Sequence, residues 1–147
     1  MKIFFCLGFM LTTFFATSQK RSATFDHIGM YVRNLDTSVA FYSGLFHFDS
    51  IPNPWANARV KWFKIGEHLQ LHLVEGLKEP MKLPIMFHIS FSVASVDTFI
   101  IELKKRSIPY YNGYGALNKT DTRVDGVTQL LFKDPDGYWL EVNNAAH

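Results

Sequence analysis

Two histidines, a glutamine and a glutamate occupy matching places in this chain of 147 residues. His27 begins the run HIGMYV and His88 begins the run HISFSV, while Gln70 and Glu141 lie in the runs LQL and LEV. Imidazole nitrogens combined with carboxylate and amide oxygens suit Zn, Ni, Co, Mn or Fe. If the four side chains meet, they predict a site for one divalent metal ion.

An internal repeat is the reason to expect that they meet. Residues 27–37 (HIGMYVRNLDT) resemble residues 88–98 (HISFSVASVDT) without a gap, and residues 66–73 (GEHLQLHL) resemble residues 137–144 (GYWLEVNN). The second comparison aligns Gln70 with Glu141 and makes the preceding turn two residues longer in the second copy. Two copies of one unit that are related by a pseudo-twofold axis place equivalent residues around that axis.

Each copy predicts a strand, a helix and three further strands. The helices are expected to begin where Asn34 or Asp36, and Ser95 or Asp97, can accept hydrogen bonds from free backbone amides. A βαβββ unit leaves one apolar sheet face uncovered and therefore needs its twin to complete a core. The predicted fold class is α+β, with two tandem βαβββ modules that form a cupped, partly open mixed barrel. The modules are residues 24–76 and 85–144 of one domain, 24–147.

Strand alternation adds a second candidate next to Gln70. His68, Gln70 and His72 fall on one face of their strand. His72 can therefore ligate in place of Gln70, or act beside the metal as a proton shuttle. Gln70 is the preferred ligand because the repeat aligns it with Glu141, and Glu141 and His72 are the predicted catalytic groups. His68, nearer the turn, is expected at the rim.

The N-terminus predicts export. Lys2 precedes an apolar run from Ile3 to Phe15, and small or polar residues follow, which is the order of a signal peptide over residues 1–18. The sole cysteine, Cys6, lies in this segment, so the mature chain would have no thiol. The net charge of +2 is scattered and gives no nucleic-acid footprint. After removal of the leader, no stable membrane association is expected.

Four stretches of this sequence resemble the vicinal oxygen chelate superfamily. This superfamily includes glyoxalase I, methylmalonyl-CoA epimerase, fosfomycin-resistance thiol transferases, extradiol dioxygenases and bleomycin-binding proteins. The stretches are DHIGMYVRNLDTSVAFYSGLFHF, GEHLQLHLVEG, FHISFSVASVDTFIIELKKRSIP and FKDPDGYWLEV, of which DPDGYWLEV is the most specific. The resemblance implies paired βαβββ modules around one divalent ion, with His27, His88 and Glu141 as ligands and Gln70 in the fourth position.

A metal in such a cup can hold two neighbouring oxygens of a small substrate and stabilise negative charge as it develops. We therefore expect a metal-dependent lyase or isomerase of the glyoxalase or epimerase type. An extradiol-type dioxygenase and a metal-free protein that sequesters a ligand are the alternatives. Tyr31 and Trp139 either line the substrate pocket or fill the core, and residues 110–126 form either a lid or a surface connection. A homodimer is compatible with this organisation.

Overall fold

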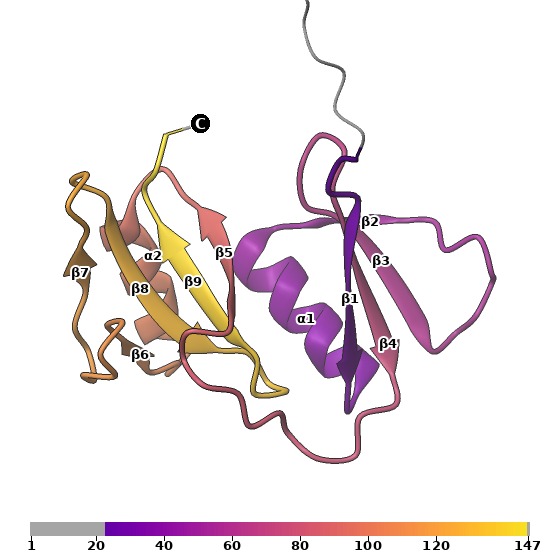
Figure 1. The fold of residues 1–147 in the computed structure, drawn as a ribbon. Coiled ribbons are helices and arrows are strands. Elements are labelled where there is room, and N and C mark those ends of the chain that lie inside the picture. The colour runs from indigo at the N-terminus through magenta and orange to yellow at the C-terminus, as the bar shows by residue number, and fades with distance from the viewer. Residues whose placement is uncertain (1–22, 147) are drawn as a thin grey trace, which may run out of the picture.

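A computed structural model describes residues 23–146, which form two sheets and two helices (Figure 1). The first sheet has the order β1–β4–β3–β2 and the second the order β5–β9–β8–β6, with β7 also paired to β8. The strands are β1 (His27–Val32), β2 (Asp49–Ile51), β3 (Val60–Lys64), β4 (Gln70–Glu75), β5 (His88–Ser92), β6 (Tyr110–Tyr111), β7 (Asp121–Thr122), β8 (Thr128–Lys133) and β9 (Trp139–Asn143). Helix α1 (Leu35–Phe46) follows β1, and helix α2 (Val96–Lys105) follows β5.

The predicted α+β fold class is confirmed. Each half has the order strand, helix and then further strands, and in each sheet the first strand runs parallel to the last. The two sheets remain separate and do not close into a barrel within the described residues. The predicted signal peptide, residues 1–18, lies outside the described residues.

Alternation along the strands buries one face of each sheet. In β1, Met30 and Val32 are buried while His27 and Tyr31 are exposed. In β9, Leu140 and Val142 are fully buried on the face opposite Trp139 and Glu141. The opposite face of each sheet therefore carries the residues that the sequence analysis predicts to take part in chemistry.

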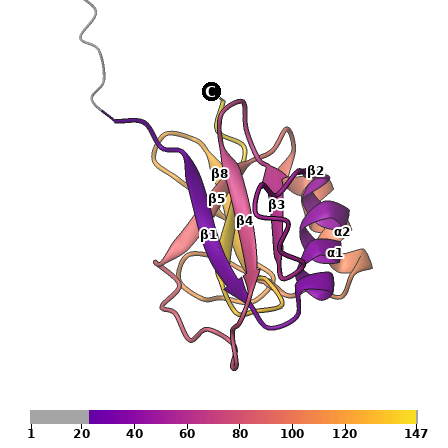
Figure 2. The same ribbon diagram turned by 90° about the vertical axis from the view of Figure 1, so that its right-hand side faces the viewer.

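Helix α1 joins the two halves because it lies between the sheets (Figure 1). Its Tyr42 is fully buried, and the ring of Phe46 lies 4.8 Å from that of Phe91 on β5 and 6.2 Å from that of Phe132 on β8. Both helices lie toward the same side of the molecule (Figure 2). The helices begin after Asn34 and Ser95, whose side chains accept hydrogen bonds from Thr37 N and Thr98 N.

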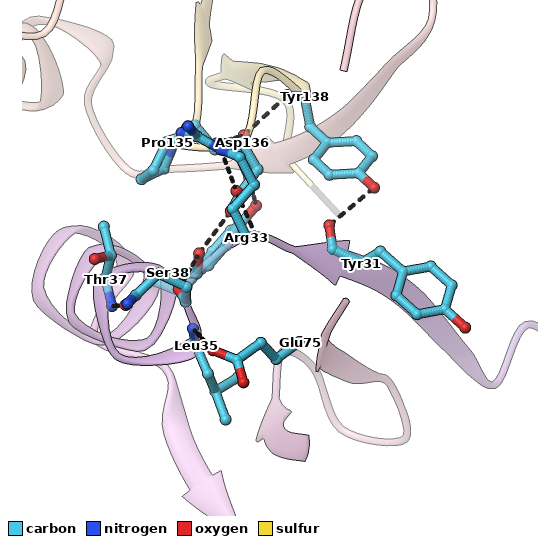
Figure 3. A network of polar contacts seen from close by, with 12 residues as sticks. Tyr31, Arg33, Leu35, Thr37, Ser38, Glu75, Pro135, Asp136 and Tyr138 are labelled. Atoms are coloured by element: carbon cyan, nitrogen blue, oxygen red, sulfur yellow. Dashed lines mark hydrogen bonds and ion pairs between the residues drawn. The ribbon is translucent and has the colours of Figure 1, made fainter. Parts of the chain in front are cut away.

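The turn between β8 and β9 anchors the second sheet to the first half of the chain (Figure 3). Asp136, 1% exposed, accepts hydrogen bonds from the backbone N of Arg33 at 2.9 Å and from Ser38 Oγ at 2.6 Å. The guanidinium of Arg33 contacts the same carboxylate. A buried carboxylate needs such donors, because an unpaired one would be costly in free energy.

A second carboxylate in this turn, Asp134, holds the turn together and reaches α1. Its Oδ1 accepts the backbone amides of Asp136 and Tyr138, both at 2.9 Å, and its Oδ2 accepts Tyr42 Oη–H at 2.8 Å. Burial raises the pKa of Asp134 to about 6. Burial, followed by the nearby Asp134 charge, also raises the pKa of Tyr42 well above its ordinary value.

Gly137 lets the linker between the halves approach this turn. Its φ is +87°, and a Cβ at this position would lie 2.5 Å from the carbonyl oxygen of Met81, so no other residue fits. Met81 N in turn donates to the Asp136 carbonyl at 2.7 Å. The connection between the two sheets is thus tied to the same turn as α1.

Residues 110–126, expected as a lid or a surface connection, contain two short strands at the edge of the second sheet. Tyr110 is buried and pairs with Phe132, and Asp121 pairs with Gln129. This segment therefore extends the sheet beyond β8. Among the described residues, no helix combines the length and apolarity that a membrane crossing requires.

Removing the Ser38 hydroxyl should destabilise the fold. In Ser38→Ala, the buried Asp136 carboxylate loses one donor, so we expect the free energy of unfolding to fall by about 1–3 kcal/mol. Ser43→Ala is the matched control on the same helix, because Ser43 Oγ donates only to the Val39 carbonyl, and its effect should stay within about 0.5 kcal/mol. Denaturant unfolding of both variants measures the difference, and equal losses would contradict this role of Ser38.

Protonation of Asp134 should stabilise the folded protein. Its pKa is about 6 in the fold against an ordinary value of 3.8, so its stabilisation is complete below pH 3.8 and is lost as the pH rises through 6. Asp134→Asn removes this loss while its amide can still face Tyr42. Between pH 4 and pH 7, the free energy of unfolding of wild type should therefore fall relative to that of the variant by an amount on the order of 3 kcal/mol. Parallel stability curves for the two proteins would refute the assignment.

Candidate metal site

His88 and Glu141 lie together on the polar face of the second sheet. His88 Nε2 is 3.3 Å from Glu141 Oε2, and the Glu141 side chain is 8% exposed. The other ring nitrogen of His88, Nδ1, lies 2.9 Å from the Ile85 carbonyl oxygen, to which only an N–H can be bonded. This bond orients the ring so that Nε2 faces the Glu141 carboxylate, and a backbone carbonyl that holds the outer ring nitrogen is typical of metal-ligating histidines.

The Glu141 carboxylate is fixed through its other oxygen. Ser90 Oγ and Asn143 Nδ2 each donate to Oε1 at 2.8 Å, and Asn143 Nδ2 also lies 2.9 Å from Ser90 Oγ. Ser90 and Asn143 stand on the same sheet face as Glu141 because they are two residues from His88 and Glu141 along their strands. Sequence reasoning missed both, although this spacing could have identified them.

His27 and His72 lie together on the first sheet. Their rings are stacked with centroids 4.4 Å apart, and His72 also stacks on Trp62 at 3.8 Å. His27 Nδ1 lies 2.6 Å from Asp26 Oδ2, so the Nδ1–H donates to this carboxylate. Asp26 precedes His27 directly, and sequence reasoning did not select it.

Gln70 contacts His72 and not the other candidate ligands. Gln70 Oε1 is 2.9 Å from His72 Nε2, so the histidine donates to the amide oxygen. Burial, and then the neighbouring His27, lower the pKa of His72, which keeps its ring neutral near pH 7. His68, expected at the rim, has a side chain that is 86% exposed.

The structure does not bring the two pairs into one group. Among residues 23–146, no three His, Cys, Asp or Glu side chains lie close enough to hold a metal ion together. His27 and His72 belong to the first sheet, and His88 and Glu141 to the second. The expected convergence of four side chains is therefore not seen among the described residues, and each sheet carries one of the two pairs.

The strand register corrects the repeat alignment of Gln70 with Glu141. In the first sheet His27 lies opposite Gln70 and Gly29 opposite His72; in the second, His88 lies opposite Trp139 and Ser90 opposite Glu141. The β3–β4 and β8–β9 hairpins show the same correspondence, because Lys64 pairs with Gln70 in the first and Lys133 pairs with Trp139 in the second. The two turns thus have equal length, and the structural counterpart of Glu141 is His72.

The two expected pocket residues lie in different surroundings. Tyr31 is 60% exposed on β1. Trp139 is half-buried, donates from Nε1 to the Leu83 carbonyl at 3.0 Å, and lies under the Lys133 ammonium. Trp139 and His88 border a crevice of about 1140 Å³ between the two sheets, whose walls include the exposed Phe25 and Phe87.

The donor atoms fit a divalent ion of the Zn, Ni, Co, Mn or Fe group. In His27 and His88 one ring nitrogen is held by an oxygen partner, and in Glu141 one carboxylate oxygen is held by Ser90 and Asn143. Such outer hydrogen bonds orient metal ligands and raise their basicity. The roles of His27, Gln70, His88 and Glu141 as ligands, and of Glu141 and His72 in proton transfer, stay predictions.

Comparison with known proteins identifies the family. The profile of the Glyoxalase/Bleomycin resistance protein/Dioxygenase superfamily matches residues 24–142. The chain therefore belongs to this superfamily, as its resemblance to vicinal oxygen chelate proteins implied.

Individual relatives agree with this assignment. Glyoxylase I 4 of Arabidopsis thaliana is 30% identical over 127 residues, which cover 81% of this chain and 69% of the relative. The lactoylglutathione lyase of Agrobacterium tumefaciens has a TM-score of 0.62 at 18% identity, with 86% of this chain and 96% of the other covered. The fosfomycin resistance protein FosX of Listeria monocytogenes has a TM-score of 0.65 at 23% identity and the same coverage. The likeness to these two structures shows the fold alone.

Proposed function

We propose that this protein is a metal-dependent enzyme of the glyoxalase or epimerase type, a lyase or isomerase that acts on a small oxygen-chelating substrate. The observation that supports it best is the pair of His88 and Glu141, in which His88 Nδ1 and Glu141 Oε1 are held by other groups while His88 Nε2 and Glu141 Oε2 face each other at 3.3 Å. When bound, the divalent ion would supply a Lewis acid that stabilises negative charge on a substrate oxygen. His27, His88 and Glu141 would hold it, with a fourth donor from Gln70 or His72.

The chain's own residues would supply orientation and proton transfer. Ser90 and Asn143 keep the Glu141 carboxylate in one orientation. Glu141 and the neutral His72 are the groups near the ion that can accept a proton. Tyr31 and Trp139 would bound the substrate on the open faces of the two sheets. We also propose that residues 1–18 direct export of the protein; the mass of the mature chain tests this.

A second copy of the chain would complete the site. Among the described strands, β1 pairs only with β4 and β5 only with β9, so each sheet has an uncovered edge next to its histidine. Exposed Phe25 and Phe87 lie beside these edges along the crevice. A homodimer that places β5 of one protomer beside β1 of the other would bring His88 and Glu141 to His27.

Metal binding tests the proposed function. Wild-type protein dialysed against Zn²⁺ should retain about one ion per chain, and His88→Ala should weaken binding by more than about 100-fold because a ligand is lost. His68→Ala is the matched control, since the His68 side chain is 86% exposed and its ion-pair partner is Glu67. Wild-type protein that binds no Zn²⁺, Mn²⁺, Ni²⁺ or Fe²⁺ would refute the proposal and favour a metal-free ligand-sequestering protein.

A substrate panel then tests the reaction type. Metal-loaded protein should turn over an α-hydroxy carbonyl or a related oxygen chelator, and His88→Ala should not. Turnover of catechols with consumption of dioxygen would instead assign the protein as an extradiol-type dioxygenase.

Mixing two inactive variants tests the shared site. His27→Ala and His88→Ala homodimers should each lack a complete site. In a mixed dimer, one site would combine the intact His27 of one protomer with the intact His88 of the other. Random reassociation should therefore restore about a quarter of the wild-type Zn²⁺ binding. No restoration in mixed dimers, isolated through a different affinity tag on each variant, would contradict a site shared between protomers.

A further inference from the structure

Lys133 places a positive charge on the face of the second sheet that carries His88 and Glu141. Across β5, β9 and β8, His88 lies opposite Trp139, and Trp139 lies opposite Lys133. Directly opposite residues share one face of a sheet, and neighbouring strands are about 4.8 Å apart. The backbones at His88 and Lys133 are therefore roughly 10 Å apart, a span that a small organic molecule can bridge.

The ammonium of Lys133 is held in place by an aromatic ring. Its Nζ lies 4.7 Å from the centroid of the Trp139 ring, within the range of a cation–π interaction. Trp139 is itself fixed, because its Nε1–H donates to the Leu83 carbonyl at 3.0 Å and the ring of Tyr111 packs edge-on against it at 5.6 Å. The charge therefore has a defined position, although Lys133 is exposed.

This charge has no partner of opposite sign among the described residues. Other cationic side chains form ion pairs: Arg33 with Asp136, Arg59 with Glu75, Arg123 with Asp125, and both Lys105 and Arg106 with Glu102. No ion pair within residues 23–146 includes Lys133. The carboxylate next to it in the sequence, Asp134, is used by Tyr42 and by two amides of its own turn. The ammonium N–H groups of Lys133 are thus free to bind a ligand.

Tyr111 adds a second donor beside the same ring. It is half-buried in β6, opposite Leu131 on β8, and within residues 23–146 its hydroxyl has no hydrogen-bond partner. Its contact with Trp139 places it on the same face of the sheet as Lys133. One charged and one neutral donor can together bind two oxygens of a carboxylate, phosphate or phosphonate group.

We propose that Lys133 and Tyr111 form a subsite for an anionic group of the substrate, and that Trp139 is the positioning residue that holds Lys133. This inference rests on the proposed function, because it names the substrate class of the same site. The substrate is then a small oxygen chelator that carries a carboxylate, phosphate or phosphonate group a few bonds away from the oxygens that meet His88 and Glu141.

Lys64 on the first sheet is the natural comparison for Lys133. Gln70 lies opposite both His27 and Lys64, as Trp139 lies opposite both His88 and Lys133. Lys64 is exposed as well, but among the described residues Lys133 is the lysine whose ammonium lies over an aromatic ring. Lys64 therefore offers a charge in the equivalent row without a ring to hold it, and Lys64→Met is the matched control.

Anion binding to the metal-free, full-length protein labelled with [15N]tryptophan tests the subsite. The probes are inorganic phosphate, acetate and methylphosphonate, each titrated at constant ionic strength. The indole N–H signal of Trp139, assigned by its loss in Trp139→Phe, should shift saturably with at least one probe, with half-saturation in the millimolar range. No saturable shift with any of the three would overturn the subsite, while the proposed function keeps its separate test by metal binding.

Variants separate a specific subsite from general attraction by positive charge. Lys133→Met keeps a side chain over Trp139 without the charge, so half-saturation should need at least about 10-fold more anion, and Lys133→Arg should recover most of the affinity. Tyr111→Phe should weaken binding by about 3-fold, and Lys64→Met should bind as wild type does. Equal losses in Lys133→Met and Lys64→Met would overturn the subsite.

Turnover connects the subsite to the reaction. In a panel of α-hydroxy carbonyls that pairs each acid with its neutral amide, metal-loaded wild type should prefer the acid by about 10-fold in kcat/KM. In Lys133→Met this preference should disappear through a higher KM for the acid, with kcat unchanged. An equal preference in the variant would overturn the role of Lys133. Absence of turnover in every protein would count against the proposed function, and the anion titrations would still decide the subsite.

Discussion

The two buried carboxylates of the β8–β9 turn are the constraint on which the arrangement of this molecule depends. Asp134 and Asp136 are almost inaccessible to solvent, and their donors from outside the turn come from the first half of the chain: Tyr42 and Ser38 on α1, and Arg33 directly after β1. A charged or polar group in such a place is tolerated only with its full set of partners. The turn therefore admits one placement of α1 against the second sheet.

This placement determines where the chemistry can lie. Because α1 is fixed between the sheets, the apolar faces of both sheets are used for the shared core, in which the rings of Phe46, Phe91 and Phe132 meet. The opposite faces carry His27 and His72 on one sheet and His88 and Glu141 on the other. The packing of one chain thus places the two pairs of candidate ligands on different sheets.

Much of the fold could be predicted from local patterns, since alternation in the strands and the caps at Asn34 and Ser95 are set by neighbouring residues. The candidate ligands were found because they break the apolar pattern. The groups that orient these ligands could not all be predicted in this way. His88 is oriented by the backbone carbonyl of Ile85, and every residue type has such a carbonyl. The junction through Asp136 joins residues about a hundred positions apart, and no local pattern contains such a contact.

The alignment of Gln70 with Glu141 shows where sequence patterns lose resolution. A strand repeats every two residues, so a shift of two keeps every side chain on its face and every apolar residue in the core. LQL and LHL therefore match LEV equally well by alternation, and only the turn length decides between them. That length depends on backbone hydrogen bonds: Leu69 O accepts Ile65 N–H as Tyr138 O accepts Asp134 N–H. The equal hairpins place His72, and not Gln70, at the position of Glu141, so a two-residue ambiguity in the sequence becomes a choice between two ligand chemistries.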